Sequence, residues 1–462
     1  MSETLSHELM DLTAGELAEA LASGKVSALE ATEAAIARIE DRDRAINAVV
    51  VRDFERARAQ ARAADAALRR GERRPLLGVP MTVKESHNVG GLPTNWGSPA
   101  FSGWTAPEDS VGVARLKAAG AVILGKTNVP PFLADWQATN PVYGRTVNPW
   151  DPTRTPGGSS GGSAAALAAG MVPLEFGSDI GGSIRVPAAF CGVYGHKPSY
   201  GLVPGRGHAP PGLDGMPPAL ACVGPLARSA LDLQLALDVL AGPDEMEAVG
   251  YRLELPAPRH ATLAGHRVLV LEELPGVALD DEVRAALADL ARRLDDLSAE
   301  VARESDLLPD LAQGREIYMG LLNTTLSRGA PGATPIDAHA WMGLQDGQLA
   351  LRRRWAELFG EFDVVLAPAF GTVAYPHVEE QDPQKRTLLI NGKPTPYFDQ
   401  LGWPGVPLVA NLPATAVPIG FTRGGLPIGA QIIGPYLEDR TTIGFAALLE
   451  REFGGFRAPP PL

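Results

Sequence analysis

The chain has 462 residues, 45% of them hydrophobic and 21% charged, so it has enough apolar side chains for one large domain or two to three ordinary ones and is not disordered. Lys and Arg number 41 against 54 Asp and Glu, and the net charge of −13 argues against nucleic acid or an anionic membrane surface as a partner. The two cysteines are too few for a disulfide framework, and no Cys/His cluster has metal-ligand spacing. No run approaches the roughly 18 apolar residues of a membrane span, and the N-terminus lacks a signal-peptide pattern, so we expect a cytoplasmic protein without a metal.

Helical and strand-like patterns alternate along the chain. Helices are predicted over residues 12–39 (one or two helices), 53–70, 111–119, 163–169, 280–297 and 438–453. Strands are predicted over residues 76–83, 121–124, 172–176, 266–271, 363–367, 414–421 and 429–433. This alternation indicates an α/β fold. We expect residues 1–70 to form a helical flank packed on a core of residues 71–462, within a single structural domain overall.

Two Gly/Ser-rich turns are the most informative segments. The first, PGGSSGGS (156–163), leads directly into an apolar helix, and the second is GSDIGGSIR (177–185). Successive N–H groups of Ile180, Gly181 and Gly182 can converge as a binding site for an oxyanion. A serine nucleophile also needs a base, because a hydroxyl is weakly nucleophilic at neutral pH.

Two kinds of base compete for this role. The segment GGSSG (157–161) fits the G-x-S-x-G elbow of α/β-hydrolases, which would use a late histidine such as His339 or His377, but Pro and Gly precede it where the elbow needs a strand. The other candidate is Lys84, which ends an apolar strand-like run where desolvation favours the neutral amine. Lys126 is a weaker competitor. A phosphate-binding loop is disfavoured because no Gly-Lys-Ser/Thr ending follows.

Several motifs in order resemble the amidase signature family, in its stand-alone amidase type. They are GVPMTVKES (78–86), GKTNVP (125–130), NPWDPTRTPGG (148–158), GGSSGGSAAALAAG (157–170), GSDIGGSIRVPAAFCGVYGHKP (177–198), LPATAVPIGF (412–421) and GLPIGAQIIGP (425–435). The resemblance implies an α/β/α sandwich with a central, mostly parallel mixed β-sheet flanked by helices. It also implies hydrolysis of the C–N bonds of small or aromatic amides, with esters and carbamates (urethanes) as possible substrates and with no cofactor.

The resemblance also implies a Ser-Ser-Lys triad. Ser159 would be the nucleophile, Ser183 the bridging serine and Lys84 the base, with a cis peptide bond between Gly182 and Ser183. The N–H groups of residues 180–183 would hold the oxyanion while the carbonyl carbon is attacked.

Neighbouring residues are given supporting roles. Asp179 and Arg185 would tie the two turns together by charge-assisted hydrogen bonds, Ser160 would hydrogen-bond within the triad network, and Ser178 would be a turn residue. The resemblance implies that residues 131–136, after GKTNVP, line the acyl site, with Leu133 as the best single contact. Residues 201–220 and 311–351 depart from the family pattern and are expected to be pocket walls or entrance loops. Apolar side chains for such a pocket are Trp136, Met216, Tyr318, Met319 and Trp341.

The expected partner is a small-molecule amide, ester or carbamate, and the expected assembly is a monomer or a homodimer. An alternative from a different functional class is the glutaminase subunit of a tRNA-dependent amidotransferase. It has the same fold and triad but works inside a complex. A further alternative is an α/β-hydrolase-type esterase that uses Ser159 with a histidine base.

Overall fold

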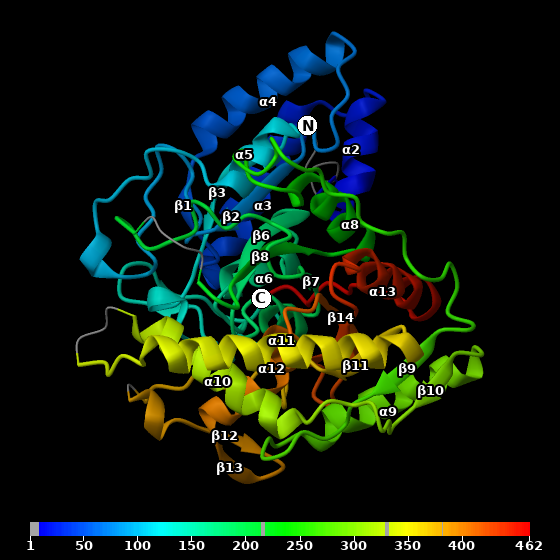
Figure 1. The fold of residues 1–462 in the computed structure, drawn as a ribbon. Helices are drawn as coiled ribbons and strands as arrows, with labels where there is room; N and C mark the ends of the chain where they lie inside the picture. The colour runs from blue at the N-terminus through cyan, green and yellow to red at the C-terminus, as the bar shows by residue number, and fades with distance from the viewer. Residues whose placement is uncertain (1–8, 214–217, 329–331, 381) are drawn as a thin grey trace.

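The computed structural model describes residues 9–213, 218–328, 332–380 and 382–462 (Figure 1). Its strands are β1 (Val49–Arg52), β2 (Pro80–Lys84), β3 (Val122–Thr127), β4 (Thr139–Asn140), β5 (Gly144–Arg145), β6 (Leu174–Asp179), β7 (Tyr194–Lys197), β8 (Cys222–Ala227), β9 (Arg267–Val270), β10 (Glu300–Ala302), β11 (Val364–Pro368), β12 (Thr387–Ile390), β13 (Lys393–Pro396), β14 (Ala414–Phe421) and β15 (Pro427–Ile433). Its α-helices are α2 (Ala14–Ala22), α3 (Ala28–Ile46), α4 (Phe54–Arg69), α5 (Val111–Ala118), α6 (Gly161–Ala168), α7 (Arg185–Cys191), α8 (Ala230–Leu240), α9 (Asp281–Asp296), α10 (Leu311–Ser327), α11 (Ala338–Glu361), α12 (Gly402–Val409) and α13 (Asp439–Phe453).

One large mixed sheet organises the molecule. In the described residues it has 11 strands in the order β1-β3-β2-β6-β8-β7-β14-β15-β11-β9-β10. The expected α/β fold, a large mixed sheet flanked by helices, is confirmed. Its mostly parallel character holds only on the two flanks, where β2 pairs in parallel with β3 and β6, and β9 with β10 and β11. From β6 through β8, β7, β14 and β15 to β11 the pairing is antiparallel, in part because a short turn joins β14 to β15 as a hairpin.

Two short buried helices carry the Gly/Ser-rich turns at their N-terminal ends. Every residue of α6 (GGSAAALA) and of α7 (RVPAAFC) is buried. Helices that are apolar on all sides belong in a core, and small side chains let them approach the sheet closely. The helix α6 packs on β2, β3, β6 and β8, whereas α7 packs on β7, β14 and β15, and the two helices contact each other. The turns before them are therefore held side by side, next to the end of β2.

The N-terminal segment lies at one end of the molecule (Figure 1). Capping boxes start α2 and α3, in which Thr13 pairs with Glu16 and Ser27 with Glu30. The same segment supplies β1, which was not expected and which pairs antiparallel with β3 at the edge of the large sheet. We keep the division at residue 70 as a proposal, with the addition that the first 70 residues contribute a strand as well as helices.

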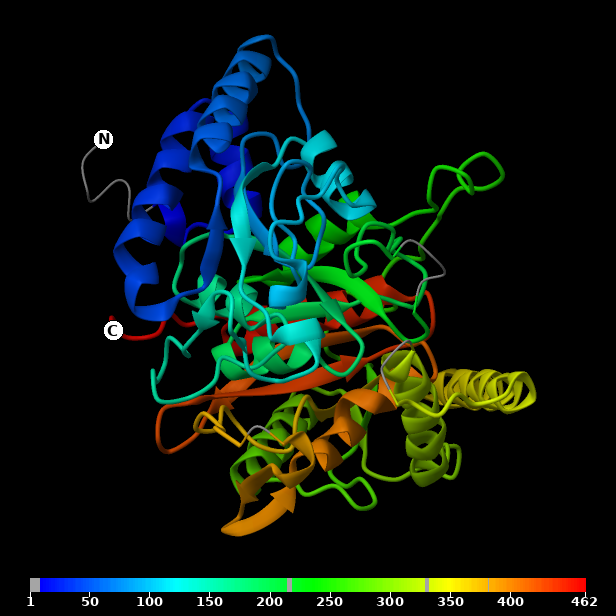
Figure 2. The ribbon, with the colours of Figure 1, turned by 90° about the vertical axis from the view of Figure 1, so that its left-hand side faces the viewer.

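Most of the described residues in the segment 311–351, which departs from the family pattern, are helical, and their role as pocket walls stays a prediction. The segment contains α10 and the start of the 24-residue α11. Figure 2 shows α11, in yellow, extending to the right of the molecule. An N-cap aspartate starts each helix, Asp310 before α10 and Asp337 before α11. Four of the side chains expected to line a pocket, those of Trp136, Tyr318, Met319 and Trp341, belong to apolar clusters. The fifth, Met216, lies outside the described residues.

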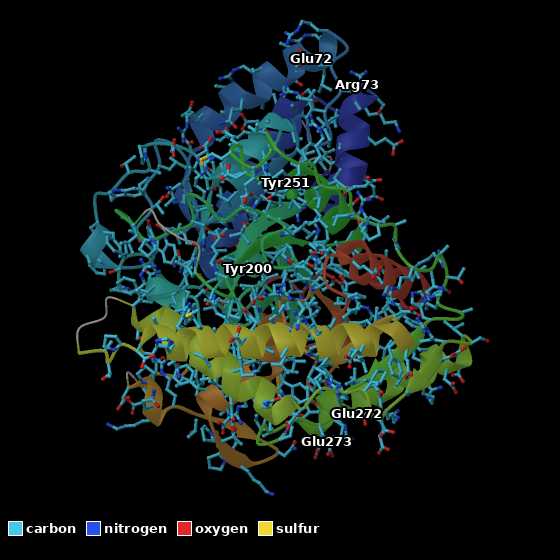
Figure 3. All side chains as sticks on the ribbon, in the orientation of Figure 1. Glu72, Arg73, Tyr200, Tyr251, Glu272 and Glu273 are labelled. Carbon is cyan, nitrogen blue, oxygen red and sulfur yellow. The ribbon has the colours of Figure 1, made fainter. Side chains whose placement is uncertain are left out.

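The side chains of Glu72 and Glu273 lie at the periphery of the molecule (Figure 3). Within the described ranges, each helix is too short or too polar to cross a membrane.

Candidate active site

Lys84 ends the buried strand β2, and its side chain is fully buried. Its Nζ lies 2.6 Å from Oγ of Ser159, 2.9 Å from Oγ of Ser178 and 3.4 Å from the carbonyl oxygen of Ser178. Burial lowers the pKa of Lys84 to about 7, although the carboxylates of Asp179 and Glu175 oppose that shift. A large fraction of the amine is therefore neutral near pH 7, as a general base requires.

Ser159 lies in the turn before α6, and its position corrects the expected order of the triad. The expected relay placed Ser183 between Lys84 and Ser159, but Ser159 contacts Lys84 directly. The expected cis bond before Ser183 is also wrong: in the described residues the one cis peptide bond joins Gly158 to Ser159. A Cβ on Gly158 would lie 2.6 Å from the carbonyl oxygen of Asp135, so a glycine there lets the turn lie close to that segment.

Ser183 lies in the second turn, just before α7, and the first turn touches it. The N–H of Ser160 donates to the carbonyl oxygen of Ser183 at 3.1 Å. The hydroxyl of Ser160 also lies 3.4 Å from the carbonyl oxygen of Ser178. Ser183 is 5% exposed and Ser159 is 1% exposed. The two turns are thus joined through Ser160, with Ser183 on the more accessible side.

Asp179 and Arg185 form a buried ion pair that frames this second turn. Arg185 donates from Nε and Nη2 to the two carboxylate oxygens of Asp179 at 3.0 and 2.9 Å. Arg185 also donates to Gln431 on β15 at 2.5 Å and to the carbonyl oxygen of Pro404 in α12 at 3.1 Å. Burial alone would raise the pKa of Asp179, but the charge and hydrogen bonds of Arg185 hold it below its ordinary value. The pair therefore stays charged and joins the turn to two distant elements.

The amides of residues 180–183 are not equivalent. The N–H of Gly182 donates to Asp179 at 2.8 Å, so this amide is already occupied. The N–H groups of Ile180, Gly181 and Ser183 have no acceptor among the described residues. On the carbonyl side, Tyr318 Oη donates to Ile180 at 3.0 Å and Trp136 Nε1 donates to Gly181 at 2.8 Å. Free amides that lie beside a serine can receive a developing negative charge.

Leu133 lies in a short 3₁₀ turn, Pro131–Leu133, with a positive φ of 61°. Its N–H donates to the carbonyl oxygen of Pro130, and its side chain is partly exposed. Its contact with an acyl group stays a prediction.

The other candidate bases, Lys126 and the late histidines, form no hydrogen bond with Ser159 among the described contacts. Lys126 Nζ donates to the carbonyl oxygen of Pro93 at 2.5 Å and to the hydroxyl of Thr94 at 2.6 Å. His339 is exposed on α11, and no described histidine hydrogen-bonds to Ser159. The segment before Ser159 consists of turns, so it is not the strand that an α/β-hydrolase elbow requires. In the described parts of the chain, no cluster of three or more His, Cys, Asp or Glu side chains is arranged to hold a metal ion.

Sequence reasoning missed the role of Ser178. It is a residue of β6 and not of a turn, and its hydroxyl contacts Lys84. The predicted strand over residues 172–176 stops three residues before the end of β6. Because β6 runs parallel to β2, a strand extended to residue 179 would have placed Ser178 beside the end of β2.

Comparisons with known proteins point to one family. The family model of the amidases matches residues 30–328 and 324–443. A glutamyl-tRNA(Gln) amidotransferase subunit from Roseiflexus castenholzii is 34% identical over 481 residues, covering 94% of each chain. A solved chain from a vestigial protein complex, described as revealing the evolutionary origins of an s-triazine catabolic enzyme, has a TM-score of 0.84 at 32% identity, covering 97% of this chain and all of that one. A bacterial aryl acylamidase of the amidase signature family has a TM-score of 0.81 at 26% identity, covering 96% of each chain.

The chain belongs to the amidase signature family, whose members are hydrolases that act on carbon–nitrogen bonds.

Proposed function

We propose that this protein is a stand-alone amidase that hydrolyses small or aromatic amides through an acyl-enzyme, with Lys84, Ser159 and Ser183 as its catalytic residues. The observation that carries the proposal is the contact between Lys84 and Ser159, with the pKa of the lysine lowered to about 7 by burial. A neutral amine in contact with a hydroxyl is the arrangement that activates a serine without a histidine.

The geometry supports a different order of roles from the one first expected. Ser159 is the residue that touches the base, so it is placed to relay a proton. Ser183 lies beside the unoccupied amides and is the more exposed of the two serines. We therefore assign Ser183 as the nucleophile and Ser159 as the bridging serine.

In the proposed reaction, the proton of Ser183 passes to Ser159, whose own proton passes to Nζ of Lys84. The oxygen of Ser183 forms a bond to the carbonyl carbon, and the negative charge on the carbonyl oxygen is held by free amides of residues 180–183. The C–N bond then breaks as Lys84 returns its proton through Ser159 to the leaving nitrogen. Water attacks the resulting ester and loses a proton by the same relay, which releases the acid and restores Ser183.

Residues 180–183, which we call the oxyanion turn, are surrounded by side chains that favour an uncharged acyl group. Trp136 and Tyr318 touch the carbonyls of this turn, and a Cβ on Gly181 would lie 3.2 Å from Leu401. The charged residues that flank this lining already have partners. The pairs are Asp135 with Arg386, Asp399 with Arg315, and Asp179 with Arg185. A free amino acid such as glutamine needs countercharges for its ammonium and carboxylate groups. Neutral amides fit better, and neutral esters and carbamates remain as further substrates because they react by the same attack.

A glutaminase subunit of an amidotransferase is the second candidate, because a relative that is 34% identical over 94% of each chain belongs to such an enzyme. In that case the chain would act with partner subunits. We also propose a cytoplasmic location, consistent with two buried cysteines that form no disulfide. A monomer or homodimer stays the proposed assembly for the stand-alone enzyme.

The test uses the purified chain with 4-nitroacetanilide, benzamide, glutamine, 4-nitrophenyl acetate and an aryl carbamate. We expect hydrolysis of the anilide or benzamide by the chain alone, loss of activity in Ser183→Ala and Ser159→Ala, and retention in Ser110→Ala, a buried serine that caps α5. Peptide mapping after diisopropyl fluorophosphate should place the adduct on Ser183. An adduct on Ser159 would restore the first assignment of roles. Hydrolysis of glutamine alone, or no hydrolysis together with co-purifying partner chains, would favour the amidotransferase function.

A further inference from the structure

Two buried aromatic side chains hold the oxyanion turn from outside the catalytic triad. Tyr318 comes from α10 and is fully buried, and Trp136 follows the Pro131–Leu133 turn and is 4% exposed. Tyr318 Oη donates to the carbonyl oxygen of Ile180 at 3.0 Å, and Trp136 Nε1 donates to the carbonyl oxygen of Gly181 at 2.8 Å. The turn therefore has consecutive carbonyls fixed by side chains that are distant in the sequence.

A hydrogen bond that holds the carbonyl group of one residue also orients the N–H of the next residue, because the two groups belong to the same peptide unit. The C=O and N–H of a trans peptide unit point in opposite directions within one plane. The bond from Tyr318 therefore directs the N–H of Gly181 away from α10, and that N–H has no acceptor among the described residues. The bond from Trp136 fixes the next peptide unit, whose N–H belongs to Gly182 and is held at its other side by Asp179 at 2.8 Å.

Within the described part of the chain, the N–H of Gly181 is left without a hydrogen-bond acceptor. Gly181 is buried, and buried N–H groups without an acceptor are rare in folded proteins. A free N–H at this place suits an oxygen that is present only during the reaction. A side chain at this position would be crowded, because a Cβ would lie 3.2 Å from Leu401 and 3.5 Å from the hydroxyl of Tyr318.

We propose that Tyr318 and Trp136 are positioning residues of this enzyme, which act by rotating the peptide units of Ile180 and Gly181 so that the Gly181 amide faces the oxyanion. The proposal rests on the function proposed above. It also connects the segment after residue 310, where the sequence departs from the family pattern, to the rate of the chemical step.

The test compares two variants with two matched controls. Tyr318→Phe removes the hydroxyl donor to the oxyanion turn, and Trp136→Phe removes the indole donor together with part of its ring. Tyr436→Phe and Trp150→Phe remove equivalent donors to the carbonyl oxygens of Tyr200 and Cys191, at 3.3 and 2.9 Å, which belong to other parts of the fold. The side chain of Tyr200 is labelled in Figure 3.

Two readouts are measured for each protein: kcat and KM on 4-nitroacetanilide, and the first-order rate constant of labelling by excess diisopropyl fluorophosphate. The folded fraction of each variant is measured by circular dichroism and the labelling rate constant is divided by it, so a partly unfolded variant still gives an answer. For Tyr318→Phe and Trp136→Phe we expect kcat and the labelling rate to fall by roughly tenfold or more with KM within about twofold, because a small misplacement of a catalytic group is costly to the rate. The control variants should match the wild type.

The outcomes separate the two proposals. Wild-type labelling rates in Tyr318→Phe and Trp136→Phe, or an equal loss in all four variants, would overturn the positioning role and leave the amidase proposal intact. A wild-type chain that neither hydrolyses any substrate nor reacts with the fluorophosphate would overturn the amidase proposal, and the positioning role with it.

Discussion

Arg185 donates two hydrogen bonds to the carboxylate of Asp179, and both side chains are 0% exposed. Removal of one partner from a buried pair leaves an uncompensated charge, which typically lowers stability by about 3–5 kcal/mol. We expect Arg185→Met to lower the free energy of unfolding in urea by that amount. Arg354→Met, which removes an exposed pair with Glu357 on α11, should leave it unchanged. Equal effects of the two substitutions would show that the buried pair has no special role.

Replacement of the proposed base tests the chemistry with little change in packing. Lys84→Met keeps a long side chain in a fully buried site and removes the amine. We expect kcat on the best amide substrate to fall by about a hundredfold to ten-thousandfold, the usual contribution of general acid–base catalysis. The melting temperature should not fall. A variant that stays folded and keeps most of its activity would contradict the role of Lys84.

The pH dependence of activity follows from the neutral amine. Because burial lowers the pKa of Lys84 to about 7, the reactive form increases as the pH rises through that value. We expect kcat/KM to rise about tenfold per pH unit below 7 and to level off above it. Burial also raises the pKa of the neighbouring Glu175 to about 7. In the variant Glu175→Gln the rise with pH should persist if Lys84 is responsible, with its midpoint moved to a lower pH because the carboxylate no longer raises the pKa of Lys84.

The same lysine affects stability with a defined sign. In the unfolded chain Lys84 has its ordinary pKa of 10.5, so between pH 7 and 10.5 the unfolded state binds a proton that the folded state lacks. Stability therefore rises with pH over this window, relative to a protein without the lysine. We expect the advantage of Lys84→Met over the wild type in urea unfolding to be largest below pH 7 and to shrink toward pH 10.5. A difference independent of pH would contradict a lowered pKa.

Ser178 provides an independent test of the lysine environment. Its hydroxyl lies 2.9 Å from Nζ and can accept a hydrogen bond, which favours the charged amine. We expect Ser178→Ala to move the pH midpoint of kcat/KM to a lower value. Ser110→Ala, at a buried serine that caps α5, should leave the midpoint in place. A midpoint that rises in Ser178→Ala would show that the hydroxyl acts in another way.

Local sequence patterns located about half of the described helices and strands, because the period of apolar residues and the caps are local signals. Among the helices, α7, α8, α10, α11 and α12 were not predicted. The segment 12–39, expected to form one or two helices, contains α2 and most of α3, and the hairpin strands β14 and β15 lie where their apolar runs predicted them. The strand β1 was missed because its four residues follow a long helix and carry no turn signal of their own. The degree of parallel pairing was misjudged because strand direction depends on connections that a pattern of residues does not encode.

The contacts within the candidate active site differ from those that the sequence led us to expect. Lys84 and Ser159 were expected to work together, and they are in contact. Which serine touches the lysine depends on how two turns pack on each other, and both turns have nearly the same Gly/Ser composition. The hydrogen bond from Tyr318 to Ile180 could not be predicted from the sequence for a similar reason, since the two residues lie 138 positions apart.

The pairing of β1 with β3 has a consequence for shortened forms of the protein. The backbone of β3 has β2 on one side and the four residues of β1 on the other. Deletion of residues 1–52 would leave one side of β3 without hydrogen-bond partners, and bare strand edges recruit other chains. A truncated version would therefore self-associate and precipitate, even though every residue proposed for catalysis would still be present.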